Sequence, residues 1–212
     1  MTMKPVKPNA RKLALQLLSG GLVGSIASLG LIKALPSLLR TEEFGGVALL
    51  ATGMIYALVG LFGGLGVAVP WIGTRLLNVA DHEDLADQRA ILAGSAVSCF
   101  ALGLALMLVA LAEPQGSVPG SLAIAALALS LVLATVITCL QWRLYDELMR
   151  GISLESTAVM AGIAFPVITL WATLAHVGKA APIDPLGLIA LIAGALLIGS
   201  FIAAGRRGML MQ

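Results

Sequence analysis

The stretch Leu122–Leu140 reads LAIAALALSLVLATVITCL and contains no charged residue. Its length matches the roughly 20 apolar residues that a helix needs to cross a bilayer core of about 30 Å. Lipid offers no hydrogen-bond partner to backbone groups, which leaves helices and closed barrels as the possible spanning structures. A barrel strand would alternate in polarity, whereas this stretch is apolar throughout. It therefore predicts a transmembrane helix.

Five further stretches pass the same test, and the charged residues are confined to short intervals between them. The chain is 59% hydrophobic and 11% charged, with a mean hydropathy of +1.00, whereas soluble domains carry about 25% charged residues. We expect an all-α polytopic bundle of six transmembrane helices over residues 13–205, between a flexible basic tail at 1–12 and a short tail at 206–212. The other predicted spans are Leu13–Ile32, Phe44–Trp71, Ala90–Ala112, Leu154–Val177 and Leu186–Ala204.

Lysine and arginine gather on one side of the predicted bundle. With the N-terminus inside, only Lys33, Arg40 and Lys179 of the 13 basic residues lie outside. This positive-inside bias predicts an N-in and C-in topology, which we expect in a bacterial inner (plasma) membrane. The apolar run from Leu13 is too long for a signal-peptide core, so we expect it to be retained as the first helix. The basic residues on the cytoplasmic side are Lys4, Lys7, Arg11, Lys12, Arg75, Arg89, Arg143, Arg150, Arg206 and Arg207.

Short polar motifs mark the expected helix boundaries. Asp184 is expected to cap the last span, with Pro185 in its first turn, and Gly178 to end the span before it. Thr41, Glu42 and Glu43 are expected to start the second span, and Asp81 and Asp84 the third. Gly151 is expected as a helix stop and Ser153 as the cap before the fifth span, and Gly205 is expected to end the sixth.

Glycine is the main packing signal. Gly20 and Gly24 form a GxxxG pair in the first span, and the second span carries Gly60, Gly63, Gly64 and Gly66. Small residues let helix backbones approach closely in lipid, so we interpret these glycines as helix-packing positions. The alternative is a discontinuous helix ending at Pro70 that exposes carbonyls to an ion. No matching break occurs in another span.

A few polar residues near the span ends are candidates for ion or proton passage, or for docking a partner. On a continuing helix, Arg143, Asp146, Glu147 and Arg150 would neutralise one another at spacings of three and four residues, which describes a solvated helix end. A docking surface or a cation inlet is the alternative.

The fifth predicted span carries an ionisable residue near each of its ends. Glu155 is a carboxylate inside a predicted span, which makes it a functional candidate, but capping in the first turn after Ser153 also explains it. His176 lies near the opposite headgroup layer, where it can titrate near neutral pH.

The sequence gives no sign of a metal site, a cofactor or a nucleic-acid partner. There is no CxxC or HExxH motif, and the two histidines, His82 and His176, fall on opposite sides of the membrane. Cys99 and Cys139 lie at different predicted depths, so we interpret them as packing residues without a disulfide. The net charge of +2 provides no basic surface for nucleic acid.

The run Arg143-Leu144-Tyr145-Asp146-Glu147-Leu148-Met149-Arg150, followed by two spans and a C-terminal arginine pair, resembles small multi-pass inner-membrane proteins of proteobacteria. Those proteins, of unassigned function, carry a cytoplasmic hairpin with a similar Asp-Glu-x-x-Arg motif. The resemblance covers the last third of the chain and implies a membrane location without any activity.

Three classes of function follow from these features. A non-catalytic accessory or scaffold subunit ranks first, because the loops are short and glycine-rich faces suit contacts with other membrane subunits or a second copy. A small ion or solute transporter or channel ranks second, with the glycines of the second span and Glu155 as its pathway. An intramembrane enzyme ranks last, because no acid, base and nucleophile are arranged together.

Overall fold

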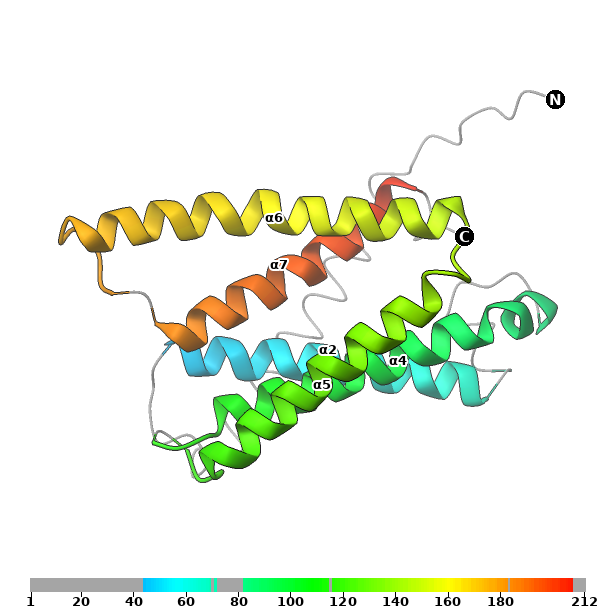
Figure 1. Cartoon of the computed structure of the whole chain (residues 1–212), viewed down its shortest axis with the longest axis horizontal. Helices are drawn as coiled ribbons and strands as arrows, with labels where there is room; N and C mark the ends of the chain where they lie inside the picture. Colours follow the sequence, from blue (N-terminus) through cyan, green and yellow to red (C-terminus); the bar gives the residue numbers. More distant parts are fainter. Residues whose placement is uncertain (1–43, 70, 72–81, 115, 183, 208–212) are drawn as a thin grey trace.

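The computed structural model describes residues 44–69, 71, 82–114, 116–182 and 184–207. In these ranges the regular structure is helical, apart from one isolated bridge between Ala112 and Val118. Within these ranges, five helices are long and apolar enough to cross a membrane (Figure 1). They are α2 (Phe44–Ala68), α4 (His82–Ala110), α5 (Gly120–Gln141), α6 (Glu147–His176) and α7 (Pro185–Arg206). The first predicted span, with Gly20 and Gly24, lies outside the described residues.

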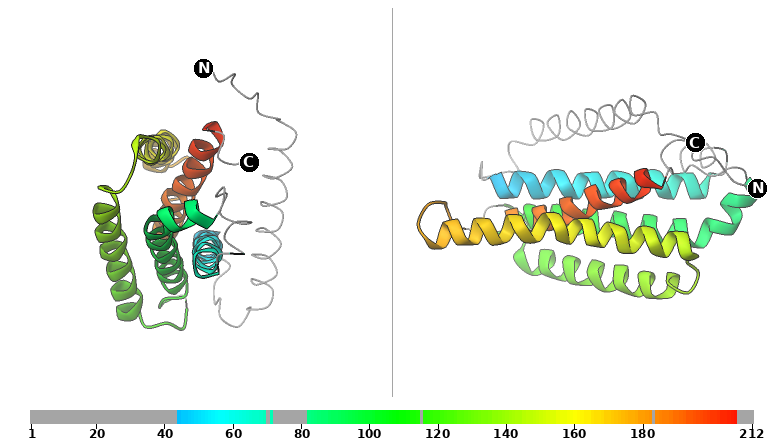
Figure 2. Two further views of the ribbon diagram at one scale, coloured as in Figure 1. Left: turned by 90° about the vertical axis from the view of Figure 1, so that its right-hand side faces the viewer. Right: turned by 90° about the horizontal axis from the view of Figure 1, so that it is seen from above.

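The five helices pack in an order that differs from their order along the chain. Helix α5 packs on α4, α4 on α2, α2 on α7, and α7 on α6. The end-on view in Figure 2 shows that this row curves, so the two outer helices α5 and α6 lie on the same side of α4 and α7. The α2–α4 and α6–α7 pairs make the two most extensive contacts.

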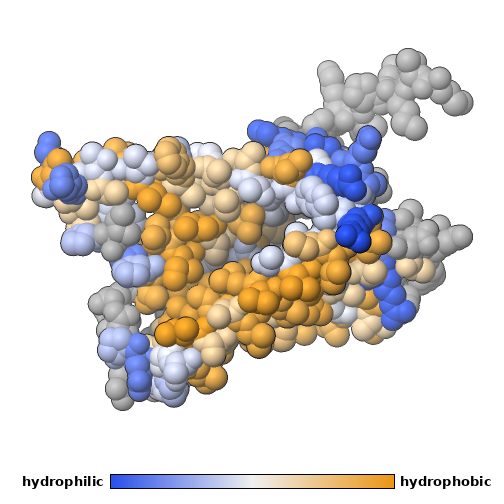
Figure 3. All heavy atoms as spheres, in the orientation of Figure 1, coloured by the Kyte–Doolittle hydropathy of each residue, from blue (hydrophilic) through white to orange (hydrophobic). Residues whose placement is uncertain are grey.

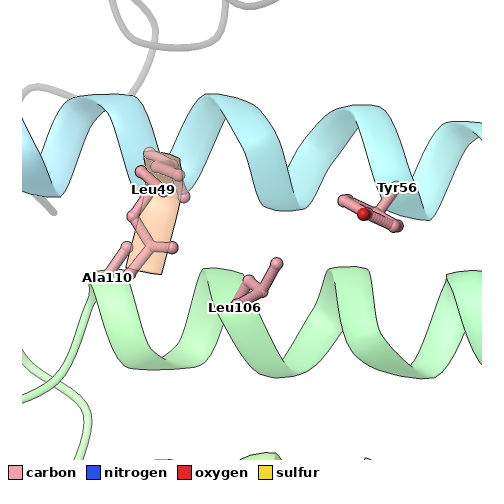
Figure 4. Packing of buried hydrophobic residues seen from close by; sticks show 6 residues of the cluster. Leu49, Tyr56, Leu106 and Ala110 are labelled. Atoms are coloured by element: carbon pink, nitrogen blue, oxygen red, sulfur yellow. The ribbon is translucent and has the colours of Figure 1, made fainter. Parts of the chain in front are cut away.

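The hydrophobic core lies where α2, α4 and α7 meet. Leu49, Tyr56, Leu106 and Ala110 belong to this cluster, with Leu49 of α2 facing Ala110 of α4 (Figure 4). The Tyr56 hydroxyl donates a hydrogen bond to the Ala193 carbonyl of α7 at 3.0 Å. A buried hydroxyl without a partner would be costly, so this bond fixes α7 against α2.

Helices α2 and α4 approach so closely that their backbones touch. A Cβ on Gly60 would meet the Phe100 backbone nitrogen and would lie 2.7 Å from the Ala96 carbonyl oxygen; one on Gly53 would lie 2.9 Å from the Gly103 oxygen. Gly53 is seven residues from Gly60, which places both on one face of the helix. The seven-residue spacing of Gly53 and Gly60 is visible in the sequence, but Gly53 was not among the predicted packing positions.

Of the three other glycines of this span predicted to mediate packing, Gly66 is buried, whereas Gly63 and Gly64 differ from each other. A Cβ on Gly63 would lie 3.3 Å from the Ala96 Cβ, so Gly63 belongs to the α2–α4 contact. No heavy atom lies within 4 Å of the Cβ position at Gly64. Among the described residues Gly64 therefore has no close neighbour, and the expectation of close packing at this position stays a prediction.

Helix α2 is unbroken through its glycines. It runs from Phe44 to Ala68, and the Val69 amide still donates to the Leu65 carbonyl at 2.9 Å. The discontinuous-helix alternative is thus wrong for the segment up to Val69, because contact with α4 supports a continuous helix. Pro70 lies outside the described residues.

Some predicted boundary signals are confirmed. The Asp184 carboxylate accepts hydrogen bonds from the Leu186 and Gly187 amides at 3.2 and 2.9 Å, and Pro185 is the first residue of α7. Gly178 follows α6 with φ of 72°, a conformation that glycine adopts readily. The aspartate-proline start and the glycine stop therefore locate the turn between α6 and α7.

Other predicted boundaries are wrong. Helix α6 begins at Glu147 and continues through Gly151, because Asp146 caps it by accepting the Met149 amide at 2.7 Å, so Ser153 is not the cap. Gly205 lies inside α7, which ends at Arg206. Helix α4, in contrast, begins at His82, between the two aspartates expected at its start, although Asp81 itself lies outside the described residues. These differences lengthen the helices at the end of the bundle that carries most of the described arginines.

Candidate functional site

The described arginines gather at one end of the bundle, where α5 and α7 finish and α6 begins. We call it the arginine end; it holds Arg89, Arg143, Arg150, Arg206 and Arg207. Among the described residues, Lys179 is the one lysine or arginine at the opposite end, where His176 also lies. Figure 3 shows hydrophilic residues gathered around this end of α6 and α7, in contrast with the apolar surface along α5.

Glu155 joins α6 to the last turn of α7. Its carboxylate oxygens lie 3.1 Å from Nη1 of Arg206 and 3.4 Å from Nε of Arg207. Glu155 is in the third turn of α6 because the helix starts at Glu147, so the interpretation of Glu155 as a first-turn capping residue is wrong. One carboxylate thus binds two guanidinium groups, and the cluster keeps a net positive charge.

Small residues bring α6 and α7 together beneath this ion pair. A Cβ on Gly151 would lie 2.7 Å from a guanidinium nitrogen of Arg207, and one on Gly199 would lie 2.5 Å from the Ser156 carbonyl oxygen. The hydroxyls of Ser156 and Ser200 are 2.9 Å apart and share a hydrogen bond. Glycine at position 151 therefore leaves room for the Arg207 side chain beside α6.

A second polar cluster fastens the end of α5 to α4. The buried Gln141 side-chain amide donates to the carbonyls of Ala90 and Ile91 at 3.1 and 2.8 Å, and its oxygen accepts from the Tyr145 hydroxyl at 3.2 Å. A Cβ on Gly94 would collide with the Gln141 amide. Sequence reasoning missed Gln141, although an amide directly after an uninterrupted apolar span is a recognisable signal for an interhelical hydrogen bond.

Tyr145 lies between α5 and α6 and keeps its proton at neutral pH. Burial raises the pKa of its hydroxyl above the ordinary value of 10.0, and a hydrogen bond with Ser95 opposes this shift. The hydroxyl therefore remains available as the donor to Gln141.

Arg150 connects the start of α6 to the end of α5. Its Nη2 donates to the Trp142 carbonyl at 3.3 Å, and its guanidinium carbon lies 5.9 Å from the centre of the Trp142 ring. The expected ion pairs among Arg143, Asp146, Glu147 and Arg150 do not form within this described segment. The chain leaves the helix between Gln141 and Glu147, so the helical spacing that would have joined these charges is lost.

His176 is remote from this cluster. It is the last residue of α6, so 21 residues separate it from Glu155, or about 30 Å at 1.5 Å per residue. The side chain is exposed at the opposite end of the bundle. Glu155 and His176 therefore cannot act on one small molecule together.

The described part of the chain contains no group of three or more His, Cys, Asp or Glu side chains placed to hold a metal ion. Cys99 and Cys139 are free thiols, the first half-buried against the core and the second exposed. The polar clusters around Glu155 and Gln141 therefore consist of hydrogen bonds and ion pairs that join α6 to α7 and α5 to α4.

Two apolar grooves open elsewhere on the bundle. One, of about 550 Å³, lies between α2 and α4 and includes Gly64, Leu65 and Val97. The other, of about 570 Å³, lies between the start of α2, α6 and α7 and includes Thr52 and Trp171. Neither groove is lined by Glu155 or its two arginine partners.

The polar clusters and the two grooves are the features of the described residues that bear on a role for this chain. Its polar residues at the arginine end fasten α5 to α4 and α6 to α7, and its grooves are apolar. In comparisons with protein-family models, curated proteins and solved structures, no match to this chain was found.

Proposed function

We propose that this chain is a non-catalytic accessory or scaffold subunit of a membrane-protein assembly. The observation that carries the proposal is the position of α6. Among the described helices, this helix of 30 residues packs extensively on α7 alone, and 6% of its most apolar stretch is buried. The polar contacts of Glu155 and Ser156 hold it in place while most of its surface remains open.

The open surface of α6 includes small residues suited to a neighbouring helix. Ala158 and Gly162 are exposed four residues apart on α6, and no heavy atom of the described residues lies within 4 Å of the Cβ position at Gly162. In lipid, helices associate chiefly through close packing at such small residues. A transmembrane helix from another subunit, or from a second copy, would therefore fit against α6.

The arginine end supports an orientation for the assembly. Five of its described residues are arginines, whereas the opposite end holds Lys179. We place the arginine end in the cytoplasm on the basis of the positive-inside rule. With the predicted span Leu13–Ile32, the proposal is a six-span N-in and C-in protein of a bacterial inner membrane.

Purification from its native membrane in a mild detergent tests the accessory role. We expect the chain to co-purify with other membrane subunits, or with copies of itself, at a fixed stoichiometry. Gly162→Leu should release those partners without unfolding the chain, because the site is open. Gly194→Leu on α7 is the matched control, since its Cβ position also has no neighbour within 4 Å. A lone monodisperse chain would contradict the proposal.

Transport of a small ion or solute is the second candidate. Glu155 favours it, because a carboxylate in a membrane helix is a common element of ion pathways. The continuous α2 removes the carbonyl site that its glycines suggested. In the same detergent preparation, a rise in thermal stability with one specific solute would favour transport over the accessory role.

A further inference from the structure

Three arginine side chains meet where the end of α7 lies against the start of α6. Arg206 and Arg207 both reach the Glu155 carboxylate, at 3.1 and 3.4 Å. The guanidinium of Arg207 also lies over Gly151, whose Cβ position is 2.7 Å from one of its nitrogens. Arg150 is the chain neighbour of Gly151, so its side chain starts beside the same spot. We call these three arginines the arginine cluster.

The arginine cluster carries more positive charge than the described side chains around it neutralise. Glu155 is the one carboxylate within ion-pair distance of it among the described residues. Three guanidinium groups against one carboxylate leave an excess of two positive charges. Asp146 and Glu147 lie at the start of α6 beside Arg143. When these three are included, one positive charge is still in excess.

The arginine cluster also has hydrogen-bond donors left for a further acceptor. A guanidinium group has five N–H donors. Glu155 is contacted by Nη1 of Arg206 and Nε of Arg207, and Nη2 of Arg150 donates to the Trp142 carbonyl. The Arg206 side chain is 66% exposed and that of Arg207 is 35% exposed. Guanidinium groups bind phosphate through paired hydrogen bonds, so phosphate oxygens suit the remaining donors.

Apolar side chains border the arginine cluster on the side of the membrane-spanning helices. Leu154 lies one turn after Arg150 on the same face of α6 and is mostly exposed. Ile198 and Phe201 of α7 are about half exposed. Figure 3 shows the hydrophilic surface at this end of α6 and α7 next to apolar surface. A molecule with a phosphate group and an apolar body matches this border.

We propose that the arginine cluster binds the headgroup phosphate of an anionic phospholipid, whose acyl chains lie on the apolar surface of α6 and α7. Basic residues between membrane helices bind such headgroups. The excess positive charge favours an anionic lipid over a zwitterionic one, and the apolar border favours a lipid over a free anion. Glu155 holds the two arginines of α7 against α6 and limits their charge. The inference rests on the membrane location and is independent of the accessory role.

Lipid binding by the purified full-length chain tests the inference. Native mass spectrometry in a mild detergent counts bound phosphatidylglycerol and, for comparison, phosphatidylcholine with the same acyl chains. We expect phosphatidylglycerol to bind preferentially. Arg206→Gln combined with Arg207→Gln should weaken its binding about tenfold, because each basic residue near anionic lipid contributes several-fold, and should leave phosphatidylcholine unchanged.

The matched control combines Arg89→Gln with Arg143→Gln. It removes the same charge from the arginine end but lies outside the arginine cluster, so phosphatidylglycerol binding should fall much less.

Glu155→Gln separates lipid binding from a purely structural role of the ion pairs. This change keeps both arginines and removes the carboxylate that competes for them. We expect phosphatidylglycerol to bind several-fold more tightly to this variant. If the ion pairs only hold α6 against α7, binding should instead weaken together with thermal stability, which would contradict the inference.

Three further results would overturn the inference. These are equal binding of the two lipids, equal losses from the two double variants, and complete displacement of phosphatidylglycerol by millimolar inorganic phosphate at constant ionic strength. The last result would assign the arginine cluster to a free anion. Because the chain is tested alone, none of these results bears on co-purifying subunits, and the accessory role succeeds or fails separately.

Discussion

The α2–α4 pair and the α6–α7 pair are held together by different means. Along α2 and α4, glycines at positions 53, 60 and 103 bring backbone against backbone, and apolar side chains complete the contact. Helices α6 and α7 are joined near the arginine end by Glu155 and Ser156, and most of α6 stays open. The first pair forms a rigid centre, whereas the second presents a helix to its surroundings.

The largest effect is expected from Gly60→Leu. Its side chain would enter the backbone of α4 at Phe100 and Ala96, and overpacking against backbone costs about 3 kcal/mol or more. We expect a severe loss of folded protein in detergent, measured by size-exclusion chromatography and thermal unfolding. Gly162→Leu on α6 is the control and should fold normally; equal damage from both would refute the contrast between the two pairs.

A smaller effect is expected from Gln141→Leu. This change removes the hydrogen bonds to the Ala90 and Ile91 carbonyls and the partner of the Tyr145 hydroxyl. We expect a loss of about 1–2 kcal/mol, measured as a lower unfolding temperature. Leu140→Ala on the exposed neighbouring position should change stability much less. If Gln141→Leu is neutral, the α4–α5 contact is secured by packing instead.

A double-mutant cycle measures the hydroxyl pair between α6 and α7. Ser156→Ala, Ser200→Ala and the double variant should give a coupling free energy of about 0.6 kcal/mol, the average for interhelical hydrogen bonds in a membrane protein. Unfolding in mixed micelles provides the three free energies. Additive effects would show that the 2.9 Å contact contributes nothing to holding α6.

Glu155→Gln should have the smallest effect on stability, because the ion pairs lie near the exposed end of the helices. Salt screens such charges. We therefore expect the difference in unfolding temperature from the unaltered chain to shrink as sodium chloride is added. A difference that is large and unaffected by salt would point to a buried role for this carboxylate.

Composition was sufficient to predict helices long and apolar enough to cross a membrane, and local chemistry was sufficient for the turn at Gly178 and Asp184. The start of α6 was missed because Asp146 and Ser153 are both good capping residue types, and the helix uses Asp146, whose carboxylate accepts the Met149 amide. Helix rotation decides which glycine meets a neighbour, so the sequence alone could not tell that Gly60 touches the α4 backbone while no described residue lies against the Gly64 Cβ position. Packing order and the role of Gln141 also depend on long-range contacts.

The central claim is that α6 presents its open face to another membrane protein. The most direct measurement is photo-cross-linking in intact cells, with a photoreactive residue at Ala158 of α6 and, for comparison, at Leu131 on the exposed face of α5. The account predicts one discrete protein adduct from position 158 and none, or a different one, from position 131. Only lipid adducts from position 158 would contradict it.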